Sequence, residues 1–200
     1  MSTTLTSAPK QTRMQMQPEN IRAIMAGRKT QTRRLCKLPG IETENLQDPE
    51  FHAAALLLSP FGQVGDLLWF TEPYAEVNLP DSEGYTTVFR ADTPQDDDTK
   101  WTPARFMPKA KVRLWGVITS LRLERLQMIT REDALAEGIE KRQGSGYFAY
   151  KNYDTDGLPL LEPQASFASM WRGINGPDSW NLNSVVWVVG FKVISQPGPL

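Results

Sequence analysis

The chain has 200 residues, of which 40% are hydrophobic, 22% are charged and 10% are aromatic. This length predicts one domain of generous size, or one domain with long insertions. The net charge of −1 and the sequence pI of about 5.9 disfavour a generic nucleic-acid binder, because such proteins carry an excess of basic charge.

The sequence also disfavours membrane insertion, secretion, and metal or disulfide chemistry. No apolar run approaches the roughly 20 residues of a membrane-spanning helix, and residues 1–14 lack the apolar stretch of a signal peptide. A single cysteine, Cys36, excludes an internal disulfide, and a single histidine, His52, cannot supply the His/Cys cluster of a zinc site. We therefore expect a reducing cytoplasm of bacterial or phage context, with no metal, no cofactor and no membrane partner.

The N-terminal part predicts a leader, a helix and a strand. Residues 1–13 are expected to be disordered, and residues 18–27, "PENIRAIMAG", to form a short helix with a proline in its first turn. Gly27 is a suitable stop for this helix. Residues 29–35, "KTQTRRL", alternate polar side chains like a strand at a surface or a site. Residues 37–60 are expected to be irregular, apart from the apolar patch "AAALLL" at 53–58.

The middle of the chain predicts two strands within long connections. Two glycines provide a turn before a buried strand over residues 67–70. Residues 76–108 are expected to be mostly loop, with a strand at 85–91. Residues 111–126, "KVRLWGVITSLRLERL", are the clearest strand of the chain, and Gly116 is a candidate bulge within it.

The C-terminal part predicts two helices and a closing strand. Residues 130–138 indicate a short helix, capped by its first threonine and ended by its glycine. Residues 140–162 are expected to be a loop. An amphipathic helix follows over 163–174, and a buried strand over 184–194. Residues 196–200 are a tail. We assign Trp171 and Trp187 to the core, on helical and strand periodicity.

The order of these elements predicts an α+β fold: a small mixed, mostly antiparallel β-barrel with flanking helices and long insertions. A doubly wound parallel sheet requires regular alternation of strands and helices with short connections, and this order lacks both. We expect a single domain over residues 14–195.

Charge is distributed unevenly along the chain. Residues 10–37 carry eight Lys or Arg and one acid, whereas residues 41–98 carry thirteen Asp or Glu and one base, Arg90. A basic site flanked by an acidic insertion favours a compact polar ligand over a long phosphate backbone, which rewards many contacts.

The basic stretch "GRKTQTRR", residues 27–34, allows two interpretations. It could be a solvated basic strand, or Lys29 could activate a threonine hydroxyl for attack, provided that its pKa falls from about 10.4 towards neutrality. Neighbouring arginines lower the pKa of a lysine, whereas a nearby carboxylate raises it. Lys29 and Thr32 are three residues apart and face opposite sides of a regular strand, so sharing a site requires a backbone turn or a curled lysine side chain.

Five segments together resemble the ASCH family, a branch of the PUA-like β-barrel superfamily. They are "IMAGRKTQTRR" at 24–34, "VGDLLWFTEPY" at 64–74, "WTPARFMP" at 101–108, "ITREDALAEGI" at 129–139, and "WRGING…WNLNSVVWVVGF" at 171–191. The resemblance covers most of residues 16–194. The chain is similar to the longer ASCH proteins that are common in phages and prophages. This chain departs from the family pattern by insertions at about 37–60, 75–108 and 141–162.

The resemblance implies an activity, because a small bacterial member of this family is an amidohydrolase of N4-acetylcytidine with a Lys/Thr/Glu triad. Carried over by motif position, the implied catalytic residues are Lys29, Thr32 and Glu137, and Arg34 matches the arginine that closes the motif. The implied partner is a small acylated cytosine nucleoside. Thr32 could attack the acyl carbonyl, or a water could attack directly; Glu137 could orient Lys29 or protonate the leaving amine.

Further substrate-binding residues are expected among aromatic and polar side chains near these motifs, since nucleobases stack on aromatic faces. The candidates are Trp69, Phe70, Glu72, Tyr74 and Trp101, and Trp69 and Phe70 fit a barrel core at least as well.

Two other classes of function stay open. An RNA-binding PUA-like module, or a ribonuclease as its variant, could use the basic region at 10–37 with Lys109, Lys111 and Arg113 as a phosphate track. Alternatively, the chain could be a phage accessory protein that binds a partner without catalysis.

Overall fold

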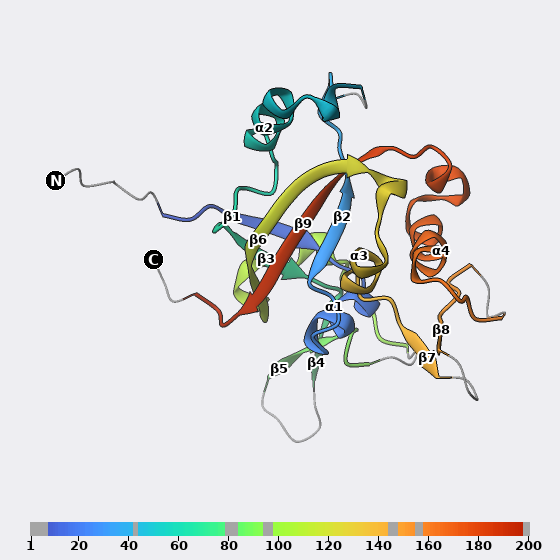
Figure 1. Ribbon diagram of the computed structural model, residues 1–200. Coiled ribbons are helices and arrows are strands. Elements are labelled where there is room, and N and C mark those ends of the chain that lie inside the picture. Colours follow the sequence, from blue (N-terminus) through green and yellow to red (C-terminus); the bar gives the residue numbers. More distant parts are fainter. Residues whose placement is uncertain are drawn as a thin grey trace.

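The computed structural model describes residues 8–41, 44–78, 84–93, 98–143, 148–154 and 158–197. Within them the chain is mixed α+β with mostly antiparallel sheets, as predicted (Figure 1). The main sheet has the strand order β1 (Gln11–Gln15), β3 (Leu67–Thr71), β6 (Leu114–Arg125), β9 (Val185–Ile194) and β2 (Gln31–Leu35). Only β1 and β3 pair in parallel; the other neighbours are antiparallel.

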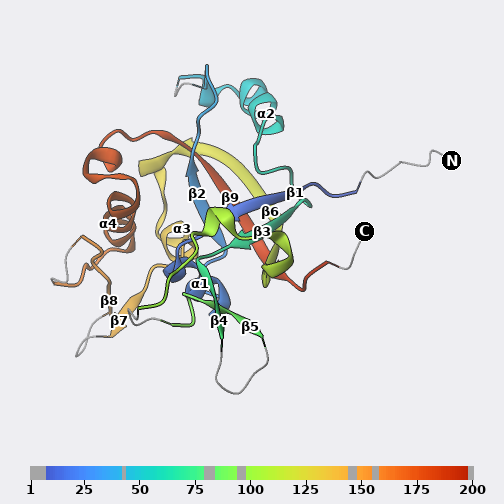
Figure 2. The same ribbon diagram turned by 180° about the vertical axis from the view of Figure 1, so that it is seen from behind.

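Helices and two hairpins surround this sheet. The helices are α1 (Pro18–Met25), α2 (Pro49–Leu57), α3 (Arg131–Ala136) and α4 (Pro163–Asn175), and the hairpins pair β4 (Tyr74–Asn78) with β5 (Tyr85–Phe89) and β7 (Lys141–Gln143) with β8 (Phe148–Tyr150). Short 3-10 turns cover Glu44–Gln47, Ala104–Phe106, Lys109–Lys111, Leu126–Met128 and Pro177–Trp180. Figure 2 shows α2 and the β4–β5 hairpin at opposite ends of the molecule, with α4, β7 and β8 along one side.

Strand β9 separates two hydrophobic cores, because successive side chains of a strand point to opposite faces. Trp187, Val189 and Phe191 belong to the core that also takes in α1, whereas Val186 and Val188 pack with residues of α3 and α4. This explains why "VVWVVGF" is apolar without alternation: both faces of the strand are covered. The candidate site lies where the connection between α1 and β2 meets the C-terminal end of α3.

Gly116 is not at the bulge that the sequence predicted there. The register between β6 and β9 shifts between Ile118 and Ser120, two residues further along. Gly116 has a packing role instead, since a Cβ at this position would lie 3.1 Å from Cε2 of the Phe70 ring. A side chain there would displace a ring that is buried in the core.

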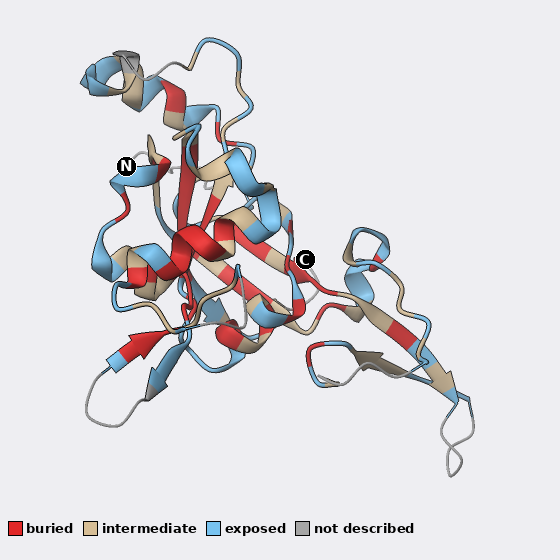
Figure 3. Cartoon of the chain, turned by 90° about the vertical axis from the view of Figure 1, so that its right-hand side faces the viewer, coloured by how far each residue is buried: buried red, intermediate tan, exposed pale blue. Residues whose placement is uncertain are grey.

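Several segments predicted to be irregular contain regular structure. Part of the expected leader forms β1, because pairing with β3 satisfies its backbone; residues 1–7 lie outside the described part of the chain. The segment 37–60 contains α2, whose N-cap Asp48 accepts hydrogen bonds from the amides of Glu50 and Phe51. Figure 3 shows α2, at the top of the molecule, mostly as exposed residues, and Ala55 is its buried member.

The two other predicted loops contain hairpins. The segment 76–108 has β4 beside the expected strand β5, and 140–162 contains β7 and β8. These strands are three to five residues long, and each pair is joined through residues outside the described part. Strands this short give little periodicity, so cross-strand pairing rather than local pattern determines them. In the predicted tail, residues 198–200 likewise lie outside the described part.

Candidate active site

The backbone brings the end of α1, the start of β2 and the end of α3 together. The amides of Arg28 and Lys29 both donate to the carbonyl of Ala23, which turns the chain at the end of the helix. The Thr30 amide then donates to the Ala136 carbonyl at 2.9 Å, and Lys29 forms an isolated antiparallel bridge with Glu137. Two residues far apart in sequence therefore lie directly opposite each other.

Gly138 permits this approach. Its φ of +88° lies in the left-handed region that favours glycine, and it ends α3 immediately after Glu137. A Cβ at this position would lie 2.8 Å from Cβ of Lys29 and 2.9 Å from Cβ of Ala23. The "EG" pair of the motif thus provides both the carboxylate and the space for the lysine.

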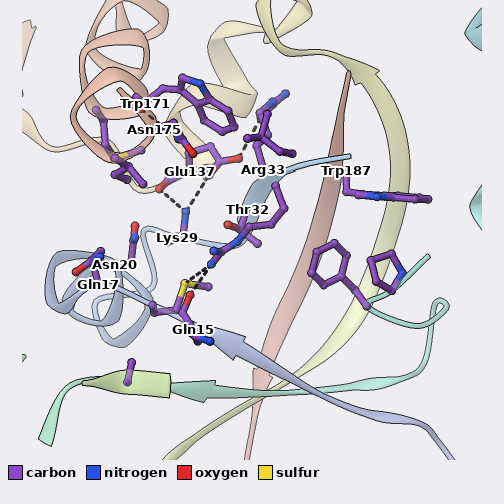
Figure 4. A pocket seen from close by; sticks show the side chains of 18 of the residues that line it. Gln15, Gln17, Asn20, Lys29, Thr32, Arg33, Glu137, Trp171, Asn175 and Trp187 are labelled. Carbon is purple, nitrogen blue, oxygen red and sulfur yellow. Dashed lines mark hydrogen bonds and ion pairs between the residues drawn. The ribbon is translucent and has the colours of Figure 1, made fainter. Parts of the chain in front are cut away.

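Lys29 and Glu137 form a buried ion pair, and each is 2% exposed. The Lys29 ammonium donates to Glu137 Oε2 at 2.8 Å and to the backbone carbonyl of Glu137 at 3.0 Å. In Figure 4 Lys29, Glu137 and Arg33 point towards one another, with Thr32 beside them. Two hydrogen bonds to one residue hold the amine in a defined position.

A second layer of charges fixes Glu137. Arg33 Nη1 donates to Glu137 Oε1 at 3.2 Å, so both carboxylate oxygens accept from a cation. Arg33 Nη2 also donates to Asp133 Oδ2 at 2.8 Å and to Glu124. Arg122 contacts the same two acids, Asp133 at 2.6 Å and Glu124 at 2.9 Å. The hydrogen bonds from Arg33 and Arg122 outweigh the effect of burial and lower the pKa of Asp133.

Burial lowers the pKa of Lys29 below that of a free lysine, because a charged amine loses its hydration inside the protein. Glu137 opposes this shift through its charge and its hydrogen bond, and the nearby charges of Arg34 and Arg33 add to the lowering. The net direction is downward, towards the range in which a lysine acts as a base.

Lys29, Thr32 and Glu137 all line one cavity of about 780 Å³, which is large enough for a nucleoside-sized ligand. Regular β2 begins only at Gln31, and Lys29 lies before it in the isolated bridge to Glu137, so Lys29 and Thr32 are not held to the opposite faces of one continuous strand. Thr32 is 4% exposed, and among the described residues no hydrogen bond involves its hydroxyl. That hydroxyl is therefore available to a ligand.

Of the other predicted binding residues, Arg34 lines the cavity and five do not. Phe70 is in the core against Phe191, with ring centroids 4.9 Å apart, and Trp69 packs beside Trp115. Glu72 is buried and paired with Arg113, Tyr74 bridges to Thr102, and Trp101 is half-buried just before that bridge.

Pro73, which lies between Glu72 and Tyr74, does line the cavity, as do Pro103, Ala104 and Arg105, which follow Trp101 by two to four residues. Alternate residues of an extended chain face opposite ways, so Pro73 can line the cavity while Glu72 and Tyr74 do not.

The aromatic faces in the cavity lining come from Phe61, Phe167, Trp171 and Trp187. Both tryptophans assigned to the core are indeed buried, at 4% and 1% exposure, and they form the cavity wall at the same time. Arg33, Asp133 and Glu124 were missed as a network. The spacing of Asp133 and Glu137 on one short helix was the available signal, because residues four apart share a helix face.

The lone histidine and cysteine take no part in this site. His52 lies in α2, and its Nε2 accepts a hydrogen bond from the Leu123 amide at 3.4 Å. Cys36 follows β2 and is half-buried. In the described ranges no group of three His, Cys, Asp or Glu residues could hold a metal ion. Nor does any described helix have the length and apolar character that crossing a bilayer requires.

Comparison of the chain with protein-family models, with curated proteins and with solved structures found no match.

Proposed function

We propose that this chain is an ASCH-type domain and an amidohydrolase that removes the acyl group from N4-acylated cytosine nucleosides in the cytoplasm. The observation that carries the proposal is the buried Lys29–Glu137 pair, 2.8 Å apart, in a cavity that Thr32 also lines. Buried ion pairs are costly to maintain, and a perturbed lysine in a cavity is a recognised sign of a functional site.

The sheet is compatible with the PUA-like barrel of that family. Its hydrogen-bonded order ends at β1 on one side and β2 on the other. Arg34 of β2 donates to the carbonyl of Gln15 in β1 at 2.6 Å, so a side chain connects the two edge strands. We propose that the strands curl into a barrel that this arginine helps to close.

In the proposed reaction, the amine of Lys29 accepts the proton of Thr32, and the threonine oxygen attacks the acyl carbonyl carbon. The lowered pKa of Lys29 increases the fraction of neutral amine that can act as this base. The protonated lysine then donates to N4 of cytosine as the carbon–nitrogen bond breaks, which leaves the acyl group on Thr32. A water attacks this ester, releases the carboxylic acid and restores the hydroxyl.

The surroundings of Glu137 favour an orienting role over proton donation. Both of its oxygens accept hydrogen bonds from cations, Lys29 on one side and Arg33 on the other. A proton on either oxygen would break one of these charge-assisted bonds, which are about twice as strong as neutral ones. We therefore assign the proton relay to Lys29 and its positioning to Glu137.

The rival RNA-binding interpretation loses part of its predicted phosphate track. Lys111 is paired with Glu76, and Arg113 with Glu72 and Asp92, so neither cation is available without breaking an ion pair. Lys109 contacts Gln11 and the face of Trp115. A track of many unpaired cations is what strong phosphate-backbone binding requires.

The test is hydrolysis of N4-acetylcytidine, followed by absorbance, with the wild-type protein and two variants. Lys29→Met keeps the length of the side chain without an amine, and Glu137→Gln keeps its shape without the charge. We expect turnover by the wild type, a loss of about 10²–10⁴-fold in kcat for Lys29→Met, and a smaller loss for Glu137→Gln. Circular dichroism melting of each variant separates loss of chemistry from loss of fold.

Absence of turnover by folded wild-type protein, with N4-acetylcytidine and with bulkier acyl groups alike, would refute the enzymatic proposal. RNA binding and partner binding without catalysis are then the interpretations to test, RNA binding first. A Lys29→Met variant that retains full activity would refute the assignment of the base.

A further inference from the structure

We propose that the cavity contains an anion subsite for the phosphate of the substrate, so that the preferred substrate is an N4-acylated cytosine nucleotide with a 5′-phosphate rather than an uncharged nucleoside. This inference rests on the proposed function, because it specifies the substrate class of the same site.

The cavity is far more basic than the protein as a whole. The chain has a net charge of −1, yet the described residues lining the cavity include five cationic side chains and one acidic side chain, Glu137. The cationic residues are Lys29, Arg33, Arg34, Lys37 and Arg105. Low-dielectric walls concentrate the field of such charges and raise the local concentration of anions.

Two of these five cations are already neutralised. Lys29 pairs with Glu137, and Arg33 pairs with Glu137, Asp133 and Glu124. Among the residues that the structure describes, the other three form no ion pair with a carboxylate. Lys37 and Arg105 are exposed at the cavity, and the Arg105 guanidinium lies 4.6 Å from the centre of the Phe106 ring. The cations of the cavity that no ion pair neutralises are therefore Arg34, Lys37 and Arg105, and Arg34 also lies within the electrostatic influence of Glu137.

Arg34 is the arginine of β2 that forms no ion pair with a carboxylate among the described residues. Its guanidinium donates to the Gln15 carbonyl at 2.6 Å and to the Met16 sulfur at 3.3 Å, which are both uncharged acceptors. Its Nε, like that of Arg33, is buried without a hydrogen-bond partner among the described residues. An oxyanion is the acceptor that a guanidinium binds best.

Some of the cations elsewhere in the described part are paired with acids, which makes them less available to a nucleic-acid backbone. Salt bridges join Arg22 to Glu19, Lys111 to Glu76, Arg113 to Glu72 and Asp92, Arg131 to Glu162, Lys151 to Glu140, and Arg172 to Asp154. Unpaired cations gathered in one cavity suit one or two phosphates, whereas a polynucleotide rewards many contacts along a groove.

The order of residues along β2 matches the order of groups in such a nucleotide. Thr32, which is proposed to meet the acyl carbonyl, is followed two residues later on the same face by Arg34, about 7 Å further along the strand. Lys37 lies beyond the end of the strand. Acyl group, base, sugar and phosphate therefore run in the direction Thr32, Arg34, Lys37. A carboxylate on a short acyl group would lie near Thr32 instead, away from these cations.

The experiment compares kcat/KM for N4-acetylcytidine and for N4-acetylcytidine 5′-monophosphate with the full chain. We expect the wild type to prefer the monophosphate by at least about tenfold, and inorganic phosphate to compete with the monophosphate. In Lys37→Gln and Arg105→Gln we expect this preference to fall towards one, mainly through a rise in KM for the monophosphate. Lys141→Gln removes an exposed cation outside the cavity and is the matched control, for which the preference stays unchanged.

Equal kcat/KM for the two substrates, or a preference that Lys37→Gln and Arg105→Gln leave intact, overturns the proposal. If N4-succinylcytidine is preferred over N4-acetylcytidine 5′-monophosphate, the anion subsite binds the acyl group and not the phosphate, which overturns the proposal as well. If the protein prefers a short acetylated RNA, with a steep dependence on salt, the substrate is RNA and the nucleotide proposal is overturned. If neither small substrate is hydrolysed, the proposed function fails separately, and calorimetric binding of cytidine 5′-monophosphate against cytidine still decides the anion subsite.

Discussion

At the scale of single residues, the candidate site depends on Lys29, whose pKa is subject to opposing influences. Burial and the charges of Arg33 and Arg34 lower the pKa of Lys29, while Glu137 raises it. The carboxylate thus positions the amine and at the same time limits how far its pKa falls. This opposition makes the pH dependence of the rate a direct probe of the contact between Lys29 and Glu137.

Replacing Glu137 by Gln should lower kcat. It should also lower the pH at which activity begins to increase. The neutral amine is the active form, so activity increases as pH passes the pKa of Lys29, and loss of the carboxylate lowers that pKa further. The pH–rate profile of hydrolysis measures this directly. Glu162→Gln removes an exposed carboxylate that pairs with Arg131 and should leave the profile unchanged. If activity in Glu137→Gln increases only at a higher pH than in the wild type, the explanation is contradicted.

Gly138 is the other residue on which the site depends. Gly138→Ala should cost stability and abolish most hydrolysis, because the new Cβ would lie 2.8 Å from Cβ of Lys29. Gly65→Ala is its control: Gly65 has a similar φ of +95°, with nothing within 4 Å of the added Cβ. Both variants bear a strain of about 1–2 kcal/mol from the left-handed backbone. Thermal melting and hydrolysis should both be impaired more in Gly138→Ala than in Gly65→Ala. Equal losses of activity would argue against the close approach at Gly138.

At the scale of elements, the six-residue helix α3 carries Glu137 at its C-cap and Asp133 in its first turn. A helix this short is not stable alone, so its cap and its packing hold it in place. Thr130 Oγ1 accepts a hydrogen bond from the Asp133 amide at 3.1 Å and begins the helix.

Thr130→Ala should therefore cost about 1 kcal/mol of stability, or roughly 2–4 °C in Tm for a chain of this size. Thr130→Ser keeps the hydroxyl and should restore most of the loss. Thermal melting followed by circular dichroism measures both variants. Equal melting temperatures for Thr130→Ala and wild type would mean that the cap does not stabilise α3.

The connection between β3 and β6 contains a second buried carboxylate, with a different role. Glu72 is 1% exposed, and Arg113 donates to its two oxygens at 2.8 and 3.1 Å. Burial raises the pKa of Glu72 in spite of this arginine. A raised pKa means that the folded state binds the proton more tightly than the unfolded state does, so the associated stability is lost as pH rises through the folded-state pKa.

Arg113→Ala should destabilise the protein by about 3 kcal/mol near neutral pH, because it leaves a buried carboxylate without its cation. The loss should grow as pH rises above the ordinary pKa of a glutamate, because Glu72 ionises in the unfolded state but resists ionisation in the folded state. Urea unfolding at several pH values gives these free energies. The double variant Arg113→Ala, Glu72→Gln should recover much of the stability, and a double variant as unstable as Arg113→Ala would contradict the explanation.

Secondary structure was predictable wherever the local pattern was strong. The amphipathic α4, the apolar strands β6 and β9, and the capped helix α3 all follow from periodicity and cap residues that the sequence displays. Helix α2 was missed because "PEFHAAALL" is apolar on all sides, so no amphipathic stripe marks it. Strand β1 was missed because its five polar-rich residues form a strand only through pairing with β3.

At the scale of the whole molecule, the site is assembled from segments about 110 residues apart, and this limits what the sequence can predict. The meeting of Lys29, Thr32 and Glu137 in one cavity was expected from the motif resemblance and not from local pattern. The Arg33 network and the walls formed by Trp171 and Trp187 require knowledge of which strand faces lie inside. The predicted binding residues missed the cavity by one position in an extended segment, at Pro73 against Glu72 and Tyr74.

The most direct test of the central claim is N4-acetylcytidine hydrolysis by Thr32→Val beside Thr71→Val. Both threonines are buried strand residues whose hydroxyls have no partner among the described residues, but Thr32 lines the cavity and Thr71 does not. The account predicts turnover by the wild type and by Thr71→Val, and a loss of at least about a hundredfold in Thr32→Val. Undiminished turnover in Thr32→Val, or none in the wild type, would contradict it.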